Sequence, residues 1–539
     1  MGDLSKVTRA RLGVDFGTTR TVVAYADRGN YPVVSFFDEA GDAHDWFPSV
    51  VAERGGELRF GFDALAAAKD PAFTLIRSFK RFLSDPHAVP GKLVEVGSST
   101  LPLGDLIEYF LVALREAIQT GSNLRESLDQ KGGLRSVVAV PANAHGAQRF
   151  VTLDAFRRAG FAPAAMLNEP SAAGFEYTHR HRDTLTAKRD HVVVYDLGGG
   201  TFDASLVRMR ARRHEVLATA GINQLGGDDF DDVLVRLVLQ NAKLSRSELS
   251  PRALERLIDQ CRDAKERLNP SSRRITIDLE HVLGTSHPEA VVQVTDLYEA
   301  CMPLVERSIE AMIPVMARLE GAEPAAGARE ARGEREDAAT PDDIAGVYVV
   351  GGASELPIVA RALRQRFGRR VHRSPYPSAA IAIGLAIACD DEAGFELADR
   401  YARTFGVFRE GAAGGEITFD PIFTSDTALP ERRGAVEGAL VRCRRDYRAA
   451  HNVGHFRFFE CGAVGEDGRP RGDMTVSGDV LFPFDPRLGE VKDLRNVAVE
   501  RMGEVPRIEE EYALDENGIV AVTIRNVDVG YERAYRIGA

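Results

Sequence analysis

The sequence predicts an α/β protein that is followed by an all-β region. Strands alternate with amphipathic helices as far as about residue 390, which is the pattern of sheets covered by helices. Beyond about residue 400 the helical periodicity disappears, and short alternating runs are separated by Gly, Pro and Asp. The chain has 539 residues, enough for roughly three or four domains or subdomains.

Two strand–turn–strand units mark the α/β part. The first joins strands expected at 12–15 and 21–25, and the second joins strands expected at 192–195 and 202–207. Helices are expected where apolar residues recur every three or four positions. These helices fall at about 103–118, 230–237, 254–268 and 356–367, with further β-branched strands at 137–140 and 347–350.

Residues 395–539 are expected to form a separate β-sandwich-like domain. Its clearest signal is Asp515-Glu516-Asn517-Gly518, a hairpin-type turn that leads into a strand at 519–524. A helix-like segment is expected between residues 394 and 404. The stretch at 321–343 is rich in Ala, Gly, Arg and Glu and has no apolar period, so we expect a flexible surface insertion there.

The composition argues against several classes of protein. With 68 basic and 80 acidic side chains the formal net charge is −12, which gives no general attraction for nucleic acid or anionic membranes. No run of about 18 apolar residues could span a bilayer, and the polar N-terminus lacks the apolar core of a secretory signal. The five cysteines are scattered, so neither a disulfide framework nor a zinc site is expected. We therefore expect a cytoplasmic protein without nucleic-acid or membrane partners.

The strongest chemical signal is a device that occurs twice. Asp15-Phe16-Gly17-Thr18-Thr19 and Asp196-Leu197-Gly198-Gly199-Gly200-Thr201 each place a carboxylate at the end of a strand and then glycine and threonine in the turn. Glycine allows the backbone to approach a phosphate closely, and successive N–H groups in such a turn form an anion-binding concavity. A carboxylate at this place requires a bridging cation, so Asp15 and Asp196 predict Mg²⁺ held largely through water. Glycine turns in simple hairpins are the alternative, and one turn alone would be a weak signal.

Other phosphate-binding and metal-binding motifs are absent from the sequence. There is no Gly-x-x-x-x-Gly-Lys-Ser/Thr loop, no Gly-x-Gly-x-x-Gly between a strand and a helix, and no His-Glu-x-x-His. These absences argue against a P-loop ATPase, a dinucleotide-dependent oxidoreductase and a zinc protease.

Seven motifs lie in a fixed order between residues 11 and 390. They are 13–19, 67–70 with 79–82, 140–142 with Gln148 and Arg149, Asn168-Glu169-Pro170-Ser171-Ala172-Ala173, 196–203, 225–231 and 350–352. Together they resemble the heat shock protein 70 chaperones, which are members of the actin-like ATPase superfamily. The resemblance implies a two-lobed actin-like, or ribonuclease H-like, ATPase domain at 1–394 that binds ATP or ADP with Mg²⁺. Lobe I would comprise about 1–188 and 372–394, and lobe II about 189–371.

The resemblance also implies roles for individual residues. Lys69 would be the catalytic lysine that neutralises charge on the transferring phosphoryl group. Glu169 would position the attacking water or a metal-bound water, and Thr201 would hydrogen-bond a phosphate or that water. Asp15 and Asp196 would order the waters of the metal ion. The predicted nucleotide-binding residues are Gly17, Thr18, Thr19, Arg20, Gly198, Gly199, Gly200, Asp203, Gly226, Gly227, Asp228, Arg262, Lys265, Asn269, Gly351, Gly352, Ala353, Glu355 and Ser378, and Pro141 and Arg149 are predicted to couple the lobes.

The predicted nucleoside contacts depart from the family pattern. Arg262, Lys265 and Asn269 are spaced to share one helix face, where the family has an acidic residue, lysine and serine. Glu355 replaces the usual arginine and Ser378 the usual aspartate, and Ile222 and Arg20 replace an aspartate and an asparagine. We hypothesise that Glu355 and Arg262 form an ion pair of reversed polarity across the cleft.

The β region resembles the family's substrate-binding domain only at 429–433 and 514–520. The usual acidic and leucine-rich linker is not found between 390 and 404, and no helical lid follows the β region. The leading interpretation is therefore an atypical chaperone ATPase without a lid. It would bind unfolded or specific client polypeptides, with a J-domain co-chaperone and a nucleotide exchange factor as further partners. A small-molecule kinase of the actin-like fold and a non-catalytic nucleotide-sensing scaffold remain as alternatives.

Overall fold

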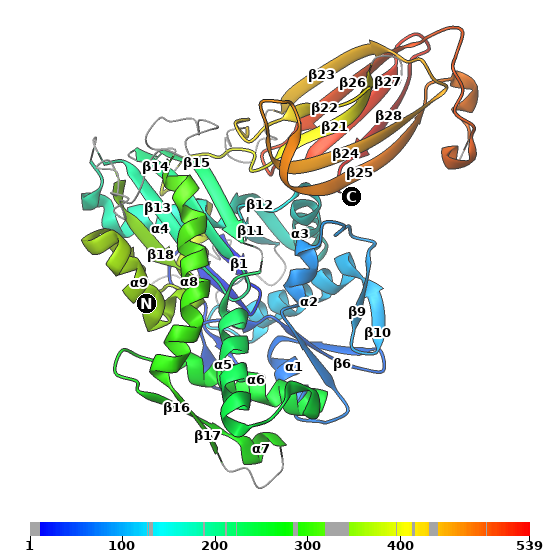
Figure 1. Cartoon of the computed structure of the whole chain (residues 1–539). Coiled ribbons are helices and arrows are strands. Elements are labelled where there is room, and N and C mark those ends of the chain that lie inside the picture. The colour runs from blue at the N-terminus through cyan, green and yellow to red at the C-terminus, as the bar shows by residue number, and fades with distance from the viewer. Residues whose placement is uncertain are drawn as a thin grey trace.

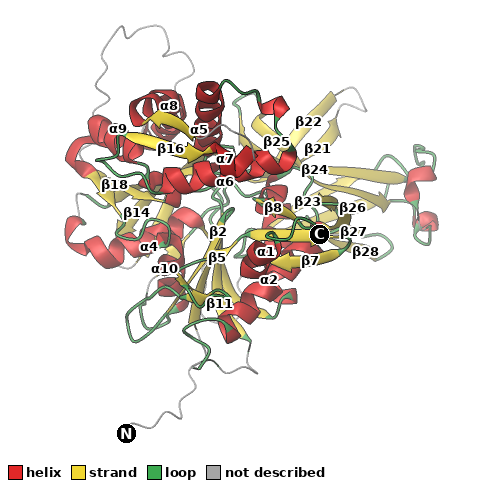
Figure 2. Cartoon of the chain, turned by 90° about the horizontal axis from the view of Figure 1, so that it is seen from below, coloured by secondary structure: helices red, strands yellow, loops and turns green. Residues whose placement is uncertain are grey.

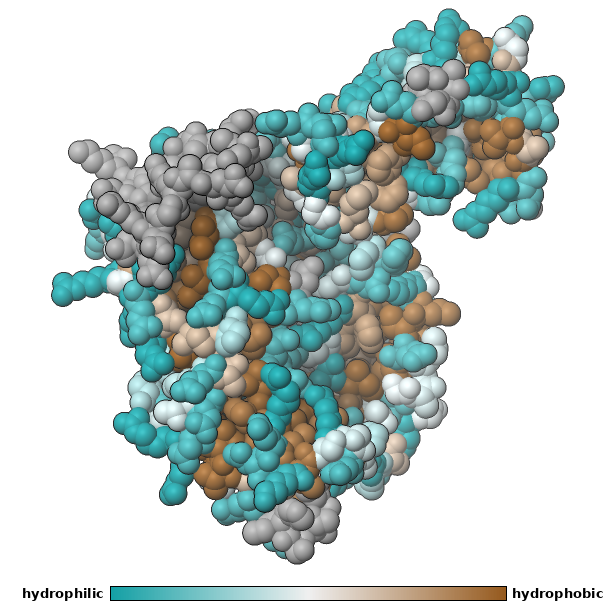
Figure 3. All heavy atoms as spheres, in the orientation of Figure 1, coloured by the Kyte–Doolittle hydropathy of each residue, from teal (hydrophilic) through white to brown (hydrophobic). Residues whose placement is uncertain are grey.

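The computed structural model describes residues 11–126, 128, 133–186, 189–210, 213–222, 224–283, 289–317, 344–394, 396–411, 416–430, 440–491 and 493–538. The chain is of mixed α/β type up to residue 394 and β-rich beyond it (Figure 1; Figure 3 shows all heavy atoms in the same view). The expected insertion at 321–343 and residues 431–433 of the family-like β segment lie outside the described residues. No helix in the described ranges combines the length and the apolar character needed to cross a membrane.

The first sheet has five strands in the order β12-β11-β1-β2-β5. β1 (Arg11–Phe16) pairs in parallel with β11 (Leu134–Val140), which pairs in parallel with β12 (Phe161–Asn168). β1 and β2 (Arg20–Tyr25) form an antiparallel hairpin, and the first glycine-containing turn joins them as the sequence predicts. α2 (Leu103–Thr120) and α3 (Gly146–Arg158) bury their apolar sides in the core of this part.

Shorter elements lie between β2 and α2 along the chain, and one of them, β5, is an edge strand of the first sheet. They are β3 (Phe36–Phe37), β4 (Ala43–His44), β5 (Phe47–Pro48), β6 (Val50–Arg54), β7 (Glu57–Phe60), α1 (Gly61–Ala67), β8 (Thr74–Arg77), the 3₁₀ helix η1 (Phe79–Ser84), β9 (Leu93–Val96) and β10 (Ser99–Pro102).

The second sheet repeats this design with six strands in the order β19-β18-β13-β14-β15-β20. β13 (His191–Leu197) and β14 (Phe202–Arg210) form the antiparallel hairpin that carries the second glycine-containing turn. β18 (Ile344–Val350) pairs in parallel with β13, and β19 (Val371–Arg373) pairs in parallel with β18. β15 (Arg213–Ile222) completes the antiparallel part.

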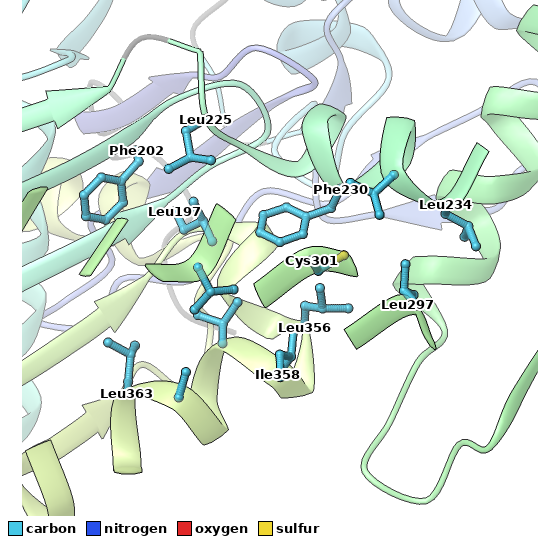
Figure 4. Close-up of a cluster of buried hydrophobic side chains, with 14 of the residues drawn as sticks. Leu197, Phe202, Leu225, Phe230, Leu234, Leu297, Cys301, Leu356, Ile358 and Leu363 are labelled. Carbon is cyan, nitrogen blue, oxygen red and sulfur yellow. The ribbon is translucent and has the colours of Figure 1, made fainter. Parts of the chain in front are cut away.

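Helices of the second part enclose a large apolar core (Figure 4). Phe202 and Leu197 of the second hairpin contribute to this core with Phe230 of α5 (Gly227–Ala242), Cys301 of α8 (Val294–Ala317) and Ile358 of α9 (Pro357–Phe367). Because one apolar cluster joins the sheet to these helices, the glycine turn after Leu197 is held on a rigid support. The other elements here are α6 (Pro251–Glu266), β16 (Arg274–Asp278), α7 (Leu279–Leu283) and β17 (Glu289–Gln293).

Two helices join the two sheets. α4 (Glu169–His181) follows β12 of the first sheet and packs against β13 and β14 of the second, and α10 (Ala380–Cys389) packs against both β1 and α4. The contact is so close that a Cβ on Gly384 would lie 1.8 Å from the carbonyl oxygen of Ala172. Glycine is therefore required at 384 for the two helices to meet, and their contact positions Glu169 at the first residue of α4.

The C-terminal part contains two four-stranded antiparallel sheets (Figures 1 and 2). One apolar cluster includes residues of both sheets, among them Phe405 and Phe458 of the third sheet and Tyr512 and Val522 of the fourth. The predicted turn at 515–518 joins β26 to β27, as expected. The third sheet has the order β22 (Glu416–Phe423), β21 (Thr404–Gly411), β24 (Val453–Val464), β25 (Pro470–Pro483), and the fourth has the order β23 (Val441–Arg448), β26 (Arg507–Leu514), β27 (Val520–Asn526), β28 (Tyr531–Arg536).

The expectation of a helix-like segment between 394 and 404 was wrong. β20 (Glu396–Ala398) is a strand that pairs in parallel with Arg213–Glu215 of β15. The free edge of the second sheet offers hydrogen-bonding groups to the passing chain, which outweighs the weak local preference for helix. The connection to the β-rich part is therefore an additional strand of the second sheet.

The β-rich part contacts the first part of the chain at α3. Glu460 of β24 is 1% exposed, and its carboxylate accepts hydrogen bonds of 3.0 and 3.1 Å from the backbone N–H of Gly146, the first residue of α3. Tyr401 donates to the same carboxylate. A carboxylate at a helix N-terminus is favourable because it pairs with unsatisfied N–H groups and with the helix dipole.

Candidate functional site

Four carboxylates converge where the two hairpins approach α4. Asp15 is the penultimate residue of β1, and Asp196 is the penultimate residue of β13. Asp203 on β14 is the antiparallel partner of Asp196. Glu169 is the first residue of α4. Asp196, Asp203 and Glu169 are each at most 6% exposed. The sequence predicted that the two turns come together, and the structure places their carboxylates in one buried cluster.

The lysine of this cluster is Lys80, and the assignment of Lys69 was wrong in position. Lys69 lies just beyond the end of α1 and is exposed. Lys80 lies in η1, is 7% exposed, and its Nζ is 3.5 Å from Oε1 of Glu169. The two lysines belong to the same family-like segment, but only the 3₁₀ turn at 79–84 enters the core, where the neighbouring Phe79 is buried.

Burial and mutual repulsion shape the electrostatics of the cluster. Burial and the nearby Glu169 raise the pKa of Asp15 to about 7 and that of Asp203 to about 8. Burial and the charges of Glu169, Asp203 and Asp15 raise the pKa of Asp196 well above its usual value. Lys80 opposes these shifts, but one ammonium group faces four carboxylates. The cluster has a strong excess of potential negative charge.

This donor set fits a hydrated divalent cation. Oδ1 of Asp196 is buried and accepts no hydrogen bond from any described residue, and an unsatisfied buried carboxylate oxygen is costly without a cation or water. In the described part of the chain, no three His, Cys, Asp or Glu side chains are arranged to ligate a metal ion directly. Asp15 and Asp196 could hold Mg²⁺ through its water shell.

The two glycine-containing turns face each other at close range. A Cβ on Gly199 would lie 2.7 Å from Oγ1 of Thr19, and a Cβ on Gly200 would lie 3.1 Å from Cγ2 of Thr18. Gly17 has equally little space, because a Cβ there would lie 2.2 Å from the carbonyl oxygen of Arg20. The turns are therefore built from backbone at the points of closest approach, which suits the binding of a phosphate chain between them.

The second turn packs against the start of α5 and against the turn after β18. The backbone N–H groups of Gly227 and Asp228 donate to the carbonyl oxygens of Gly198 and Gly199 at 2.9 and 2.8 Å. A Cβ on Gly226 would lie 2.5 Å from the backbone nitrogen of Gly200. Gly351 has φ of +85°, and a Cβ there would lie 2.3 Å from Oδ1 of Asp196. Thr201 closes this turn by accepting from the N–H of Gly198.

The predicted nucleoside residues on α6 have other partners. Arg262 lies 3.1 Å from Asp228 and 3.1 Å from Asp231, and Lys265 lies 2.6 Å from Asp231 and donates to the carbonyl of Gly227. Asn269 is not on the helix, because α6 ends at Glu266. Its side chain instead accepts hydrogen bonds from Ser271 in the following turn. Asn269 therefore does not share a helix face with Arg262 and Lys265.

The hypothesis of a Glu355–Arg262 ion pair was wrong. Glu355 is half-exposed and lies 3.5 Å from Arg373, its own neighbour beside β18. Ser378 is exposed, and its Cβ lies 3.9 Å from where a Cβ on Gly352 would be, so it borders the same turn as Ala353. The excess of carboxylates around α5 satisfies Arg262 locally, which leaves no reason for it to reach across to Glu355.

Arg20, at the start of β2 in the first sheet, contacts α6, which packs in the core of the second sheet. Its guanidinium lies 2.5 Å from Glu266 of α6 and 4.6 Å from the ring centroid of Trp46. Arg77 likewise lies 2.8 Å from Asp259 of α6. The second contact adjoins a cavity of about 300 Å³ between β8 and the helices α5 and α6.

Of the two predicted coupling residues, Arg149 contacts the β-rich part. Pro141 is buried directly after β11. Arg149 is 3% exposed, donates to the side-chain oxygen of Asn168, and donates to the backbone carbonyl of Asn517 at 3.2 Å. Asn168 in turn donates to Asp399 at 2.7 Å. Asn168, which takes part in two of these hydrogen bonds, directly precedes Glu169 in the sequence.

Lys80, Arg81 and Asp399 are the residues near the site that sequence reasoning missed. The signal for Lys80 was present, because it follows an apolar residue in the family-like segment 79–82. A buried lysine is rarely found without a charged partner, and the partner of Lys80, Glu169, is brought close only by the fold. Asp399 offered no local signal, because its partners are Asn168 and Ser171, more than 200 residues away.

Comparison with known proteins identifies the family. The model of the Hsp70 protein family matches residues 122–407. The chaperone protein HscA homologues of Burkholderia multivorans and Burkholderia ambifaria are each 34% identical over 402 residues, and that of Burkholderia pseudomallei is 33% identical over 404 residues. Each alignment covers 72% of this chain and 59% of the relative, so the chain spans less than two thirds of the length of these relatives. The chain belongs to the Hsp70 family.

Proposed function

We propose that the chain is an ATP-binding and ATP-hydrolysing chaperone of the Hsp70 type. The observation that carries this proposal is the Lys80–Glu169 pair beside three aspartates, where two facing glycine turns meet. We further propose that residues 1–394 form a two-lobed actin-like domain and that 395–539 form a β sandwich. The relatives' printed name, chaperone protein HscA homologue, supports the assignment.

The residues of the cluster suit phosphoryl transfer to water. Mg²⁺, when bound with the nucleotide, would supply positive charge at the terminal phosphates. Lys80 would neutralise charge that develops on the transferring phosphoryl group, and Glu169 would orient the attacking water. Thr18 and Thr201 would hydrogen-bond the phosphate or that water, while Asp15, Asp196 and Asp203 hold their negative charge toward the metal's water shell. Positioning and charge stabilisation are the main requirements of this reaction.

Coupling between the α/β part and the β-rich part would pass through the hydrogen bonds around Asn168. Asn168 precedes Glu169 and is bonded to Arg149 and Asp399, while Arg149 is bonded to Asn517 of the β-rich part. A change at the nucleotide would alter these contacts, and client binding in the β-rich part would act back on hydrolysis. A J-domain co-chaperone and a nucleotide exchange factor would be the expected partners.

The test is ATP turnover by the full chain with and without an unfolded peptide. Lys80→Ala is expected to lower the turnover about 10³-fold, because one cation at such a transition state contributes that much. Lys69→Ala is the matched control: it removes an exposed lysine of the same segment and is expected to keep turnover within about twofold. Removal of magnesium by a chelator should abolish turnover. Equal loss in the two lysine variants, or no turnover in the unmodified chain, would refute the proposal.

A nucleotide-sensing scaffold is the second candidate, because the family's nucleoside contacts are altered. The donors of Arg262 are engaged by Asp228 and Asp231, and Arg20 is paired with Glu266. The same assay separates the two functions. Tight binding of ATP with magnesium but no measurable phosphate release would favour the scaffold.

A further inference from the structure

Arg81 places a second cation next to the phosphate-binding turns. It follows Lys80 in η1, and its guanidinium lies against Gly200 of the second turn. A Cβ on Gly200 would lie 2.9 Å from Nε and 3.2 Å from Nη2 of Arg81, and 3.1 Å from Thr18. The guanidinium therefore lies against the same backbone that approaches the first turn.

The Nε and Nη2 groups of Arg81 form no short hydrogen bond with any described residue. Nη2 is 3.4 Å from the carbonyl oxygen of Gly200, 3.5 Å from Asp228 and 3.8 Å from Asp229, all longer than a normal charged hydrogen bond. Nε is buried, and no acceptor among the described residues forms a hydrogen bond with it. A guanidinium has five N–H donors in a rigid fork, and it matches the oxygens of a phosphate in two places at once.

A purely structural role explains these contacts less well. Asp228 already accepts hydrogen bonds from Arg262 at 3.1 Å and from Ser78 at 2.8 Å. Asp229 already accepts from the backbone N–H of Gly226 at 2.8 Å, at the start of α5. Both carboxylates accept hydrogen bonds from closer donors, so neither requires Arg81. Neither carboxylate forms a close, two-point contact with the guanidinium of Arg81.

We propose that Arg81 binds the terminal phosphate of the nucleotide and retains inorganic phosphate after hydrolysis. This inference rests on the proposed function and deepens it by adding a phosphate ligand. Arg81 belongs to η1, near the first sheet, and also contacts the turn between β13 and β14 of the second sheet. Lys80 would hold the phosphate from the buried side and Arg81 from the open side. Because ADP lacks the terminal phosphate, Arg81 distinguishes ATP from ADP, and it makes the release of phosphate a step of its own.

The test compares nucleotides with and without the terminal phosphate, using the full chain with magnesium. Calorimetry would measure ADP and the non-hydrolysable β,γ-imido analogue of ATP, and ADP release would be timed with and without inorganic phosphate. For Arg81→Gln we expect about tenfold weaker binding of the analogue, ADP affinity within twofold, and no slowing of ADP release by phosphate. Arg81→Lys should lie between this variant and the unmodified chain, because it keeps the charge but not the fork.

Arg77→Gln is the matched control. Arg77 forms an ion pair with Asp259 of α6 but lies outside the two glycine-containing turns. This variant is expected to change the affinities for ADP and the analogue by the same factor. If Arg81→Gln weakened both ligands equally, or neither, Arg81 would be only a structural contact and the inference would be overturned. If the unmodified chain bound neither ligand, the proposed function would fail as well, so the two failures are distinguishable.

Discussion

Asn168 and Asp399 are joined by a hydrogen bond of 2.7 Å from the side-chain amide of Asn168 to the carboxylate of Asp399. Asn168 ends β12 immediately before Glu169, and Asp399 follows β20 in the connection to the β-rich part. Both side chains are buried. A residue next to the proposed catalytic cluster is therefore bonded directly to the segment that links the two parts of the chain.

Replacing Asp399 should loosen this link. Asp399→Asn replaces the carboxylate oxygen that accepts hydrogen bonds from Asn168 and Ser171, and leaving a buried polar partner unsatisfied costs about 1–3 kcal/mol. We expect faster proteolytic cleavage within residues 390–404 and loss of the effect of an unfolded peptide on ATP turnover. Glu392→Gln is the control, because Glu392 is exposed and its ion pair with Arg11 is long, at 3.8 Å. Unchanged cleavage and unchanged peptide stimulation in Asp399→Asn would show that the contact does not couple the parts.

Trp46 fluorescence should report on the ion pair between Arg20 and Glu266. Trp46 is the single tryptophan of the chain, and the guanidinium of Arg20 lies over its ring while pairing with Glu266. Arg20→Ala should change the emission of Trp46 and speed nucleotide dissociation by no more than about fivefold, since exposed ion pairs contribute at most about 1 kcal/mol. Stopped-flow fluorescence would measure both effects. Glu266→Gln, which removes the ion pair but keeps the guanidinium, should speed dissociation with a smaller change in emission. A faster rate in neither variant would contradict the prediction.

His214 should make the fold sensitive to acid. Burial between β15 and α4, where the ring stacks on Phe175 at 4.6 Å, lowers the pKa of His214 to about 3. The unfolded chain takes up this proton near pH 6.5 and the folded chain only near pH 3, so stability falls as the pH decreases between these values. From pH 7 to pH 5 we expect a loss of about 2 kcal/mol in the free energy of unfolding from this residue.

Urea unfolding at both pH values would measure this loss. His214→Gln should show a smaller decrease between pH 7 and pH 5, whatever its stability at pH 7. His87→Gln is the control, because the side chain of His87 is 74% exposed. Equal pH dependence in the unmodified chain and in His214→Gln would exclude His214 as the source.

Gly384 should tolerate no side chain. The Cβ of Gly384→Ala would lie 1.8 Å from the backbone of Ala172, so α10 and α4 must separate, which we expect to cost about 2–3 kcal/mol or more. Since α4 begins with Glu169, ATP turnover should fall together with stability. Thermal unfolding and turnover would be measured beside Gly91→Ala, because a Cβ at Gly91 meets no atom within 4 Å. Similar stability of the two variants would contradict the packing described above.

Features that depend on neighbouring residues could be predicted from the sequence. The turns after Asp15 and Asp196, the amphipathic helices and the hairpin at 515–518 follow from local steric and hydrophobic patterns, and they are found within a few residues of the expected positions, although α6 ends at Glu266, before the expected end at 268. Tertiary contacts determined which of two nearby lysines is buried, which carboxylates satisfy Arg262, and that residues 396–398 add a strand to the second sheet. These outcomes depend on burial and on partners far along the chain, since a charged side chain or a strand edge pairs with whatever the fold brings within reach, and spacing along the sequence does not encode that proximity.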